Sequence, residues 1–213
     1  MIYWISVWFM RALFAVVLDF RVSGLENVPR QGPVIFIVNH SCAIDGWLTV
    51  AAIRRKVFTW TMQRNFANPV IAWILSANEQ MPVEPGGDNR ATMERTERLL
   101  REGRYLALCP EGDPHPPLPI PPFKGGFLKM ALKANALVVP IVIAGSEKIL
   151  TEPWHPKTLS QHIPRPCRVD LAILPAMRFE DRPGDRAYFG DCLEKCRQRM
   201  SAKLEELLLT RRY

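Results

Sequence analysis

One stretch of this 213-residue chain decides its fold: Val34-Ile35-Phe36-Ile37-Val38-Asn39-His40-Ser41-Cys42-Ala43-Ile44-Asp45-Gly46-Trp47. The residues from Val34 to Val38 are β-branched or aromatic, which predicts a buried strand over 33–38. Apolar spacing after Asp45 predicts a helix over 46–55. A strand that leads directly into a helix is typical of α/β proteins, in which ligands bind at the carboxyl ends of the strands. His40 therefore lies where we expect a ligand site.

His40 and Asp45 are five positions apart and form a candidate catalytic pair. A short loop can bring the carboxylate against the imidazole, where it would fix the tautomer and stabilise the imidazolium. This interpretation makes His40 a general base for a hydroxyl group. Two simpler interpretations stay open, in which Asp45 is only a helix N-cap and His40 is only a polar residue at a strand end.

Other chemistry at this stretch is less favoured. A metal ion would find two ligands here, and no His/Cys cluster in the sequence offers a third, so we expect no metal. Cys42 is a candidate nucleophile, but Ala43 and Ile44 beside it favour simple packing. The five cysteines are an odd number without metal-binding spacing, and we interpret them as reduced thiols.

The rest of the chain continues the alternation of strands and helices. Further strands are predicted at 57–62, 80–83, 105–109, 137–143 and 168–174. Further helices are predicted at 2–18, 69–77, 90–102, 126–134 and 187–209. We therefore expect an α/β fold with a mixed central sheet flanked by helices. An apolar amino-terminal helix (1–20) would precede a single domain (21–213).

Four motifs in order resemble the glycerolipid acyltransferase family, which includes the lysophosphatidic acid acyltransferases. The family's Asn-His-x-x-x-x-Asp motif is matched by Asn39, His40 and Asp45. Its Pro-Glu-Gly, Pro-Phe-Lys-x-Gly and Val-Pro-Ile segments are matched by Pro110-Glu111-Gly112, Pro122-Phe123-Lys124-Gly125-Gly126 and Val139-Pro140-Ile141. The stretch 23–29 also resembles the family's lead-in to the first strand, so the resemblance covers roughly residues 22–143.

The resemblance implies a mechanism and a set of partners. His40, oriented by Asp45, would take the proton from an acceptor hydroxyl, which would attack the thioester of acyl-CoA or acyl carrier protein. No covalent acyl-enzyme and no cofactor are needed. The acceptor would be a lyso-glycerolipid such as 1-acylglycerol-3-phosphate. Substrate contacts are expected from Asn39, Glu111, Gly112, Lys124 and Gly125, although a turn or helix cap is an equal alternative for Glu111.

Two family arginines that would bind an acceptor phosphate are missing here. Pro85 stands at the place of the first, and the run after Gly112 continues with Asp113 rather than towards the second. Either other cations replace them, or the acceptor carries a different head group, such as that of a lyso-aminolipid or a glycolipid. The sequence slightly favours the altered acceptor. The candidate replacement cations are Arg64, Arg90, Lys124 and Lys129.

Proline dominates the stretch 110–122, where seven of thirteen residues are prolines. Such a stretch is stiff and extended. We hypothesise that it forms one wall of the acceptor pocket with His115 pointing inward. A surface connector is the simpler alternative and is favoured.

The amino terminus is almost wholly apolar from Ile2 to Leu18, apart from Ser6 and Arg11. Seventeen helical residues span about 26 Å, at about 1.5 Å per residue, and a bilayer core is about 30 Å thick. We therefore expect a helix that lies in one leaflet at the cytoplasmic face of a membrane, so that the protein is monotopic or peripheral. The alternative is a helix buried in the protein itself.

The net charge of +7 also fits association with a membrane surface. The basic cluster at 54–56 would attract anionic lipid or the phosphates of CoA. Nucleic acid is not expected as a partner, because no nucleic-acid motif accompanies the charge. Trp60, Trp73 and the run 70–75 are candidates for an acyl-chain slot, but ordinary core packing is favoured.

Two other classes of function compete with the acyltransferase. A catalytically silent lipid-binding protein of the same fold would explain the missing arginines, although the His40–Asp45 pair argues against it. A metal-dependent hydrolase is the more distant alternative, because the sequence offers too few metal ligands.

Overall fold

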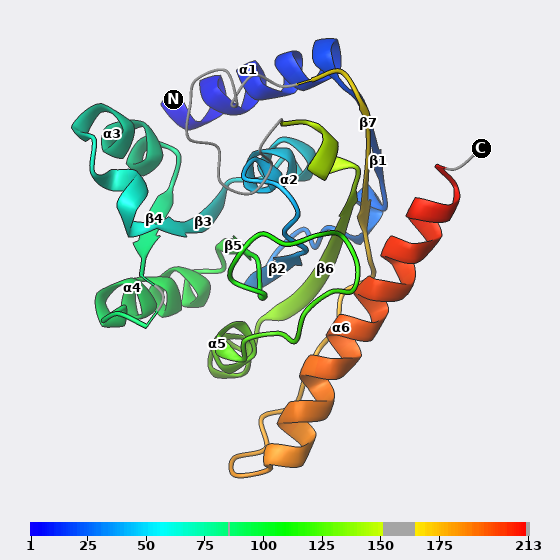
Figure 1. Cartoon of the computed structure of the whole chain (residues 1–213). Helices are drawn as coiled ribbons and strands as arrows, with labels where there is room; N and C mark the ends of the chain where they lie inside the picture. Colours follow the sequence, from blue (N-terminus) through cyan, green and yellow to red (C-terminus); the bar gives the residue numbers. More distant parts are fainter. Residues whose placement is uncertain (85, 151–164, 212–213) are drawn as a thin grey trace.

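The computed structural model describes residues 1–84, 86–150 and 165–211 and contains a seven-stranded mixed sheet (Figure 1). The strands are β1 (Asp19–Ser23), β2 (Val34–Val38), β3 (Val57–Met62), β4 (Gln80–Val83), β5 (Tyr105–Leu108), β6 (Leu137–Ala144) and β7 (Arg168–Ile173). Their order across the sheet is β1-β7-β6-β2-β5-β3-β4. Neighbouring strands run parallel, except for the antiparallel pair β6–β7. The predicted α/β class with a mixed central sheet is confirmed.

Strand β1 is an addition to the predicted elements. Phe20 and Val22 are half-buried, while the residues between and beside them are exposed, which is the alternation of an edge strand. The strand has only five residues and follows directly on the apolar helix, so its pattern is too short to stand out. The expected division between residues 20 and 21 falls inside this strand.

Helices cover both faces of the sheet. They are α1 (Ile2–Val17), α2 (Asp45–Ile53), α3 (Pro69–Ala77), α4 (Arg90–Arg101), α5 (Gly126–Ala134) and α6 (Arg186–Leu209). Side chains of β2 alternate between two cores: Val34 and Phe36 pack with α1 and α2, whereas Ile35 and Ile37 pack with α4, α5 and α6. A central strand covered on both faces needs apolar residues at every position, which explains the unbroken run in the sequence.

Helix α1 has one buried face and one exposed face. Tyr3, Val7 and Phe14 are buried in the core, whereas Trp8 and Phe9 are 66% and 65% exposed. The part of the chain that the structure describes contains no helix long and apolar enough to cross a bilayer. Membrane association of α1 stays a prediction.

The expectation of core packing for the run 70–75 is wrong. These residues belong to α3, which buries none of its side chains, and Trp73 is 60% exposed. Trp60 differs, because it is partly buried and its Nε1 donates to Thr96 Oγ1 (3.1 Å). Helix α3 extends from the β4 edge of the sheet, where no second layer of structure covers it within the described residues (Figure 1).

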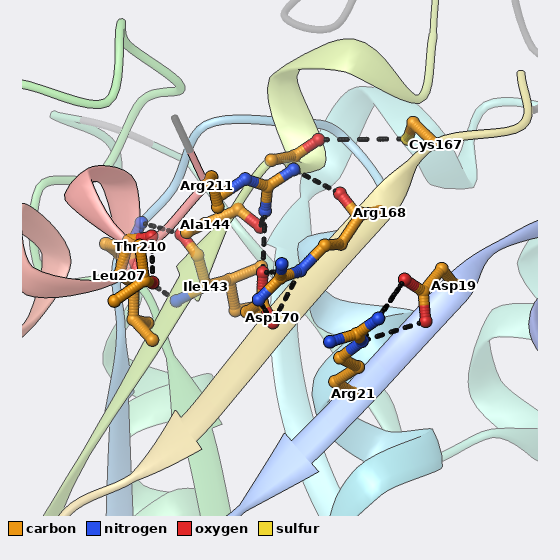
Figure 2. Close-up of polar contacts among 12 residues, drawn as sticks. Asp19, Arg21, Ile143, Ala144, Cys167, Arg168, Asp170, Leu207, Thr210 and Arg211 are labelled. Carbon is orange, nitrogen blue, oxygen red and sulfur yellow. Dashed lines mark hydrogen bonds and ion pairs between the residues drawn. The ribbon is translucent and has the colours of Figure 1, made fainter. Parts of the chain in front are cut away.

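An arginine fastens the end of α6 to the sheet (Figure 2). Arg211 Nη1 donates to the Ala144 carbonyl (2.6 Å) and lies 3.1 Å from Asp170 Oδ2, and the same guanidinium donates to the Arg168 carbonyl. Arg168 Nε also pairs with Asp170 Oδ2 (2.9 Å). Gly145 leaves room for the Arg211 guanidinium, because a Cβ at that position would run into it. These contacts hold the carboxyl end of β6, where Ile143 bonds to Asn39, the residue before His40.

Candidate active site

Asn39 joins the end of β2 to the neighbouring strand β6. Its Nδ2 donates to the Ile143 carbonyl (2.9 Å), and its Oδ1 accepts from the Ile143 N–H (2.7 Å). The side chain is fully buried, and both ends of its amide are occupied. Both polar ends of the Asn39 side chain are therefore used within the protein, and its predicted contact with substrate stays a prediction. Asn39 fixes the strand end that carries His40.

The loop after His40 folds around the carboxylate of Asp45. Asp45 Oδ2 accepts from the backbone N–H groups of Ser41 (2.7 Å) and Cys42 (2.7 Å). The same oxygen lies 3.1 Å from His40 Nδ1, and the carboxylate is fully buried. Asp45 is the first residue of α2, and Ile44 occupies the N-cap position. Asp45 therefore holds the loop and the imidazole rather than the end of the helix.

The contact with Asp45 sets the chemistry of the imidazole. When Nδ1–H donates to the carboxylate, Nε2 has a free lone pair, and His40 borders a cavity. Burial of the ring opposes protonation, but the adjacent Cys109 sulfur and the Asp45 carboxylate outweigh it and raise the pKa of His40. Burial also raises the pKa of the Cys109 thiol itself. His40 is thus arranged as a strong base.

Cys42 does not fit the role of a nucleophile. Its side chain is fully buried, and burial raises the pKa of the thiol to about 12. A thiol needs to ionise before it attacks a carbonyl. Cys109, which sequence reasoning missed, borders the cavity next to His40. Its place at the end of the predicted strand 105–109 was the available signal, because parallel neighbours end at the same edge.

The cavity in front of His40 has a volume of about 390 Å³. Its walls come from the carboxyl ends of β2, β3, β4 and β5, from the start of α2 and from the loop after β5. Most of the lining is apolar, including Trp47, Val50 and Phe127. A mostly apolar cavity with a few polar groups is typical of a site for a lipid-like molecule.

The cavity brings together four of the residues predicted to form the site. His40, Arg64, Gly112 and Lys124 line it. Arg64 comes from the 3-10 helix η2 (Gln63–Phe66), which follows β3, whereas Lys124 comes from the loop between β5 and α5. Gly112 has a left-handed φ of +93°, and a Cβ there would run into Lys124 Nζ. Glycine is therefore required for the lysine to lie where it does.

The other predicted substrate contacts lie outside the lining. Arg90 is exposed at the start of α4 and pairs with Asp88 (Nη2 to Oδ2, 3.1 Å). Lys129 is also exposed, on the surface of α5. Gly125 is the N-cap of α5, and a Cβ there would run into Phe189 at 2.8 Å. Pro85, at the place of the first missing arginine, lies outside the described residues.

The proline-rich loop (110–122) returns to the loop that begins at His40. The backbone N–H of His115 donates to the His40 carbonyl (2.9 Å). The His115 ring lies against Glu111, with Nε2 3.4 Å from Oε1. Burial disfavours a charged ring, but the neighbouring Glu111 carboxylate outweighs it and raises the pKa of His115. Pro114 borders the cavity, so the first part of this loop contributes to its wall, while Glu111 and His115 stand behind the wall.

A family model described as Acyltransferase matches residues 19–144, which is more than half of the chain. This chain belongs to the acyltransferase family. The membership expected from the four motifs is confirmed, and the match spans the strands and loops that carry them.

Curated relatives support the same membership. The chain is 29% identical over 133 residues to the chloroplastic 1-acyl-sn-glycerol-3-phosphate acyltransferase BAT2 of Brassica napus, covering 61% of this chain and 38% of that protein. It is 25% identical over 124 residues to the 1-acyl-sn-glycerol-3-phosphate acyltransferase of Borreliella burgdorferi, covering 57% of this chain and 50% of the relative. The chain thus spans half or less of the length of these relatives.

A solved structure shares the fold. The 1-acyl-sn-glycerophosphate (LPA) acyltransferase PlsC of Thermotoga maritima superposes with a TM-score of 0.73 at 21% identity. The alignment covers 95% of this chain and 78% of the Thermotoga chain. Within the described residues, no group of three or more His, Cys, Asp or Glu side chains is arranged to hold a metal ion.

Proposed function

We propose that this protein transfers an acyl group from acyl-CoA or acyl carrier protein to the hydroxyl of a lysophosphatidic acid. The observation that carries the proposal is the His40–Asp45 pair at the cavity, with Nδ1 held at 3.1 Å from the carboxylate. The two curated relatives described above are named as 1-acyl-sn-glycerol-3-phosphate acyltransferases.

The reaction needs one proton shuttle. His40 Nε2 takes the proton of the acceptor hydroxyl as its oxygen bonds to the thioester carbonyl carbon. The C–S bond then breaks, and the imidazolium returns the proton to the departing thiolate, so the products are an ester and a free thiol. Asp45 stabilises the imidazolium between these steps. General-base assistance of this kind contributes about 10²–10⁴ in rate.

Arg64 and Lys124 are the cations that would bind the acceptor phosphate. Both line the cavity, whereas Arg90 and Lys129 do not. A hydrogen bond to a charged group contributes about 1.5–3 kcal/mol. Two such contacts would replace the two arginines of the family motifs that this chain lacks. A head group without a phosphomonoester is the competing acceptor, and Glu84 in the lining would favour a cationic one.

The membrane is the proposed location of the acceptor. The exposed face of α1 presents Ile5, Trp8 and Phe9, which are 60%, 66% and 65% exposed. The basic residues at 54–56 follow α2 and lie next to the start of α1, where the Tyr3 hydroxyl contacts the Arg55 carbonyl (3.2 Å). An apolar helix face beside a basic cluster suits an anionic leaflet, and we propose the cytoplasmic face.

The test is acyl transfer from labelled acyl-CoA and acyl carrier protein to lysophosphatidate, other lysophospholipids and a lyso-aminolipid. His40→Ala should lower transfer by about 10²–10⁴-fold. Arg64→Gln and Lys124→Gln should each raise KM for lysophosphatidate by about tenfold or more. Arg90→Gln is the matched control and should change nothing. Transfer only to the lyso-aminolipid would replace the phosphate acceptor, and no transfer to any acceptor would favour a silent lipid-binding protein.

A further inference from the structure

Helix α3 has the composition of a buried helix in an exposed place. Its nine residues are Pro69-Val70-Ile71-Ala72-Trp73-Ile74-Leu75-Ser76-Ala77, and none carries a charge. The helix begins firmly, because Asn68 Oδ1 accepts from the Val70 N–H (2.9 Å) and Pro69 occupies the first turn. A helix that is apolar all round is ordinarily buried in a protein or a membrane.

The surroundings of α3 do not bury it. Within the described residues it packs mainly on η2 and β4, and none of its side chains is buried. The four largest exposed side chains are Val70, Ile71, Trp73 and Ile74, at 67%, 47%, 60% and 41% exposure. Contiguous exposed apolar groups of this kind mark a surface that contacts a partner or a membrane.

The position of α3 connects it to the site. The chain enters the helix from Arg64 and Asn65 and leaves it through Asn78 and Gln80, and these four residues all line the cavity. Helix α3 is thus an excursion of the chain between two segments of cavity wall. A molecule whose polar end lies at Arg64 would have its apolar end close to this helix.

We propose that α3 inserts into one leaflet of an anionic phospholipid membrane at the mouth of the cavity and receives the acyl chain of the lipid acceptor. Nine residues of helix span about 14 Å at about 1.5 Å per residue, so α3 can enter one leaflet of a bilayer about 30 Å thick but cannot cross it. Trp73 suits the boundary between head groups and chains, and Arg64 lies at the level of the phosphates. The role of α3 in receiving the acyl chain rests on the proposed lipid acceptor, whereas its insertion into the membrane is independent of that proposal.

A second copy of this chain fits α3 less well than a leaflet does. Stable protein interfaces use about 20–30 residues on each side. The exposed apolar surface here consists of four large side chains on one short helix. A leaflet requires only a few inserted side chains, and a second apolar surface is available on α1.

The experiment compares the full chain with a triple variant, Val70→Gln, Trp73→Gln and Ile74→Gln, whose positions share one helix face. Binding to vesicles of phosphatidylcholine and phosphatidylglycerol is measured by co-sedimentation. Transfer is measured with lysophosphatidate in the same vesicles and with lysophosphatidate dispersed in detergent micelles. The triple variant should bind vesicles about tenfold more weakly or worse and should show a raised KM in vesicles. Transfer in micelles should stay within about twofold of wild type, because the catalytic pair is untouched.

Leu209→Gln is the matched control, because Leu209 is an equally exposed apolar residue (57%) at the end of α6. It should leave both vesicle readouts unchanged. Brominated lipid should quench wild-type tryptophan fluorescence more than that of Trp73→Phe, a variant that keeps vesicle binding.

Unchanged vesicle binding in the triple variant, or equal quenching in Trp73→Phe, would overturn insertion. A wild-type dimer that the triple variant converts to a monomer would assign α3 to a second copy instead. If wild type transfers to no acceptor even in micelles, the proposed function fails, while binding and quenching still decide insertion.

Discussion

Two histidine–carboxylate pairs meet at this site, and they differ in how the carboxylate is held. Asp45 Oδ2 has two backbone N–H donors at 2.7 Å each as well as His40 Nδ1 at 3.1 Å. Glu111 lies 3.4 Å from His115 Nε2, and neither of its oxygens has a hydrogen-bond partner within the described residues. His40 faces the cavity, whereas His115 does not.

The difference shows what a histidine–carboxylate pair needs in order to act as a general base. A carboxylate fixed by backbone donors orients its histidine and leaves the second ring nitrogen for the substrate. In the second pair Nε2 itself is turned towards the carboxylate, so no basic nitrogen is offered to the cavity. We infer that the first pair does the chemistry and that the second holds the proline-rich loop against the His40 carbonyl.

The largest effect is expected for Asp45→Asn, which removes the charge and keeps the shape. The value of kcat/KM should fall by about 10²–10⁴-fold. The base form of His40 is the active one, so activity rises with pH through the pKa of His40. Because Asp45 contributes to raising that pKa, the rise in the variant should move to lower pH. The measurement is the pH profile of kcat/KM, and an unmoved profile would mean that another group limits the rate.

A smaller effect is expected for Asn39→Ala, because Asn39 acts on the His40–Asp45 pair only through the strand end that carries His40. The variant leaves the Ile143 N–H and carbonyl without their partner, at about 1–3 kcal/mol for each buried group. The free energy of unfolding and kcat should both fall, because the strand end that carries His40 is released.

Asn27→Ala is the matched control for Asn39. Its Nδ2 donates to the Ile173 carbonyl (2.8 Å) on β7, away from the cavity. We expect the free energy of unfolding, measured with urea, to fall, whereas kcat should be preserved. Equal losses of kcat in both variants would mean that Asn39 acts only through overall stability.

The smallest effect on catalysis is expected for His115→Leu. Glu111 would then be buried without its neighbour, and the free energy of unfolding should fall by about 1–3 kcal/mol. The value of kcat/KM should change by less than about tenfold, because His115 holds His40 through its backbone N–H, which leucine retains. The double variant Glu111→Met with His115→Leu should recover most of the stability, since both polar partners are gone. A loss of kcat/KM as large as that of Asp45→Asn would give His115 a direct catalytic role.

Local patterns were enough to predict much of the site from the sequence. The apolar run at 34–38 predicted β2, and the spacing to Asp45 predicted the pair that the structure finds at 3.1 Å. The four motifs predicted the family. These features depend on neighbours in the chain, so they are visible in the sequence.

The contacts of individual side chains were harder to predict. Arg64 and Arg90 were both candidate cations in the sequence, with a solvated helix face favoured for Arg90. Of the two, only Arg64 lines the cavity, because η2 follows β3 at the edge where the strands end. Asn39 resembled a substrate contact, and its hydrogen-bond partner lies 104 residues away on β6. The same holds for β1, whose short alternation gains meaning only when it pairs with β7.

The sequence by itself determined the order of most strands and helices along the chain, the His40–Asp45 pair and the family, because hydrophobic period and short motifs encode local structure. Only the tertiary structure decided which cations face the cavity, that Asn39 is a clamp and that α3 lies exposed. Those outcomes depend on strand order and on packing between distant segments. An apolar run such as 70–75 has the same composition whether protein or membrane covers it, so the sequence leaves its environment open and the fold around it decides.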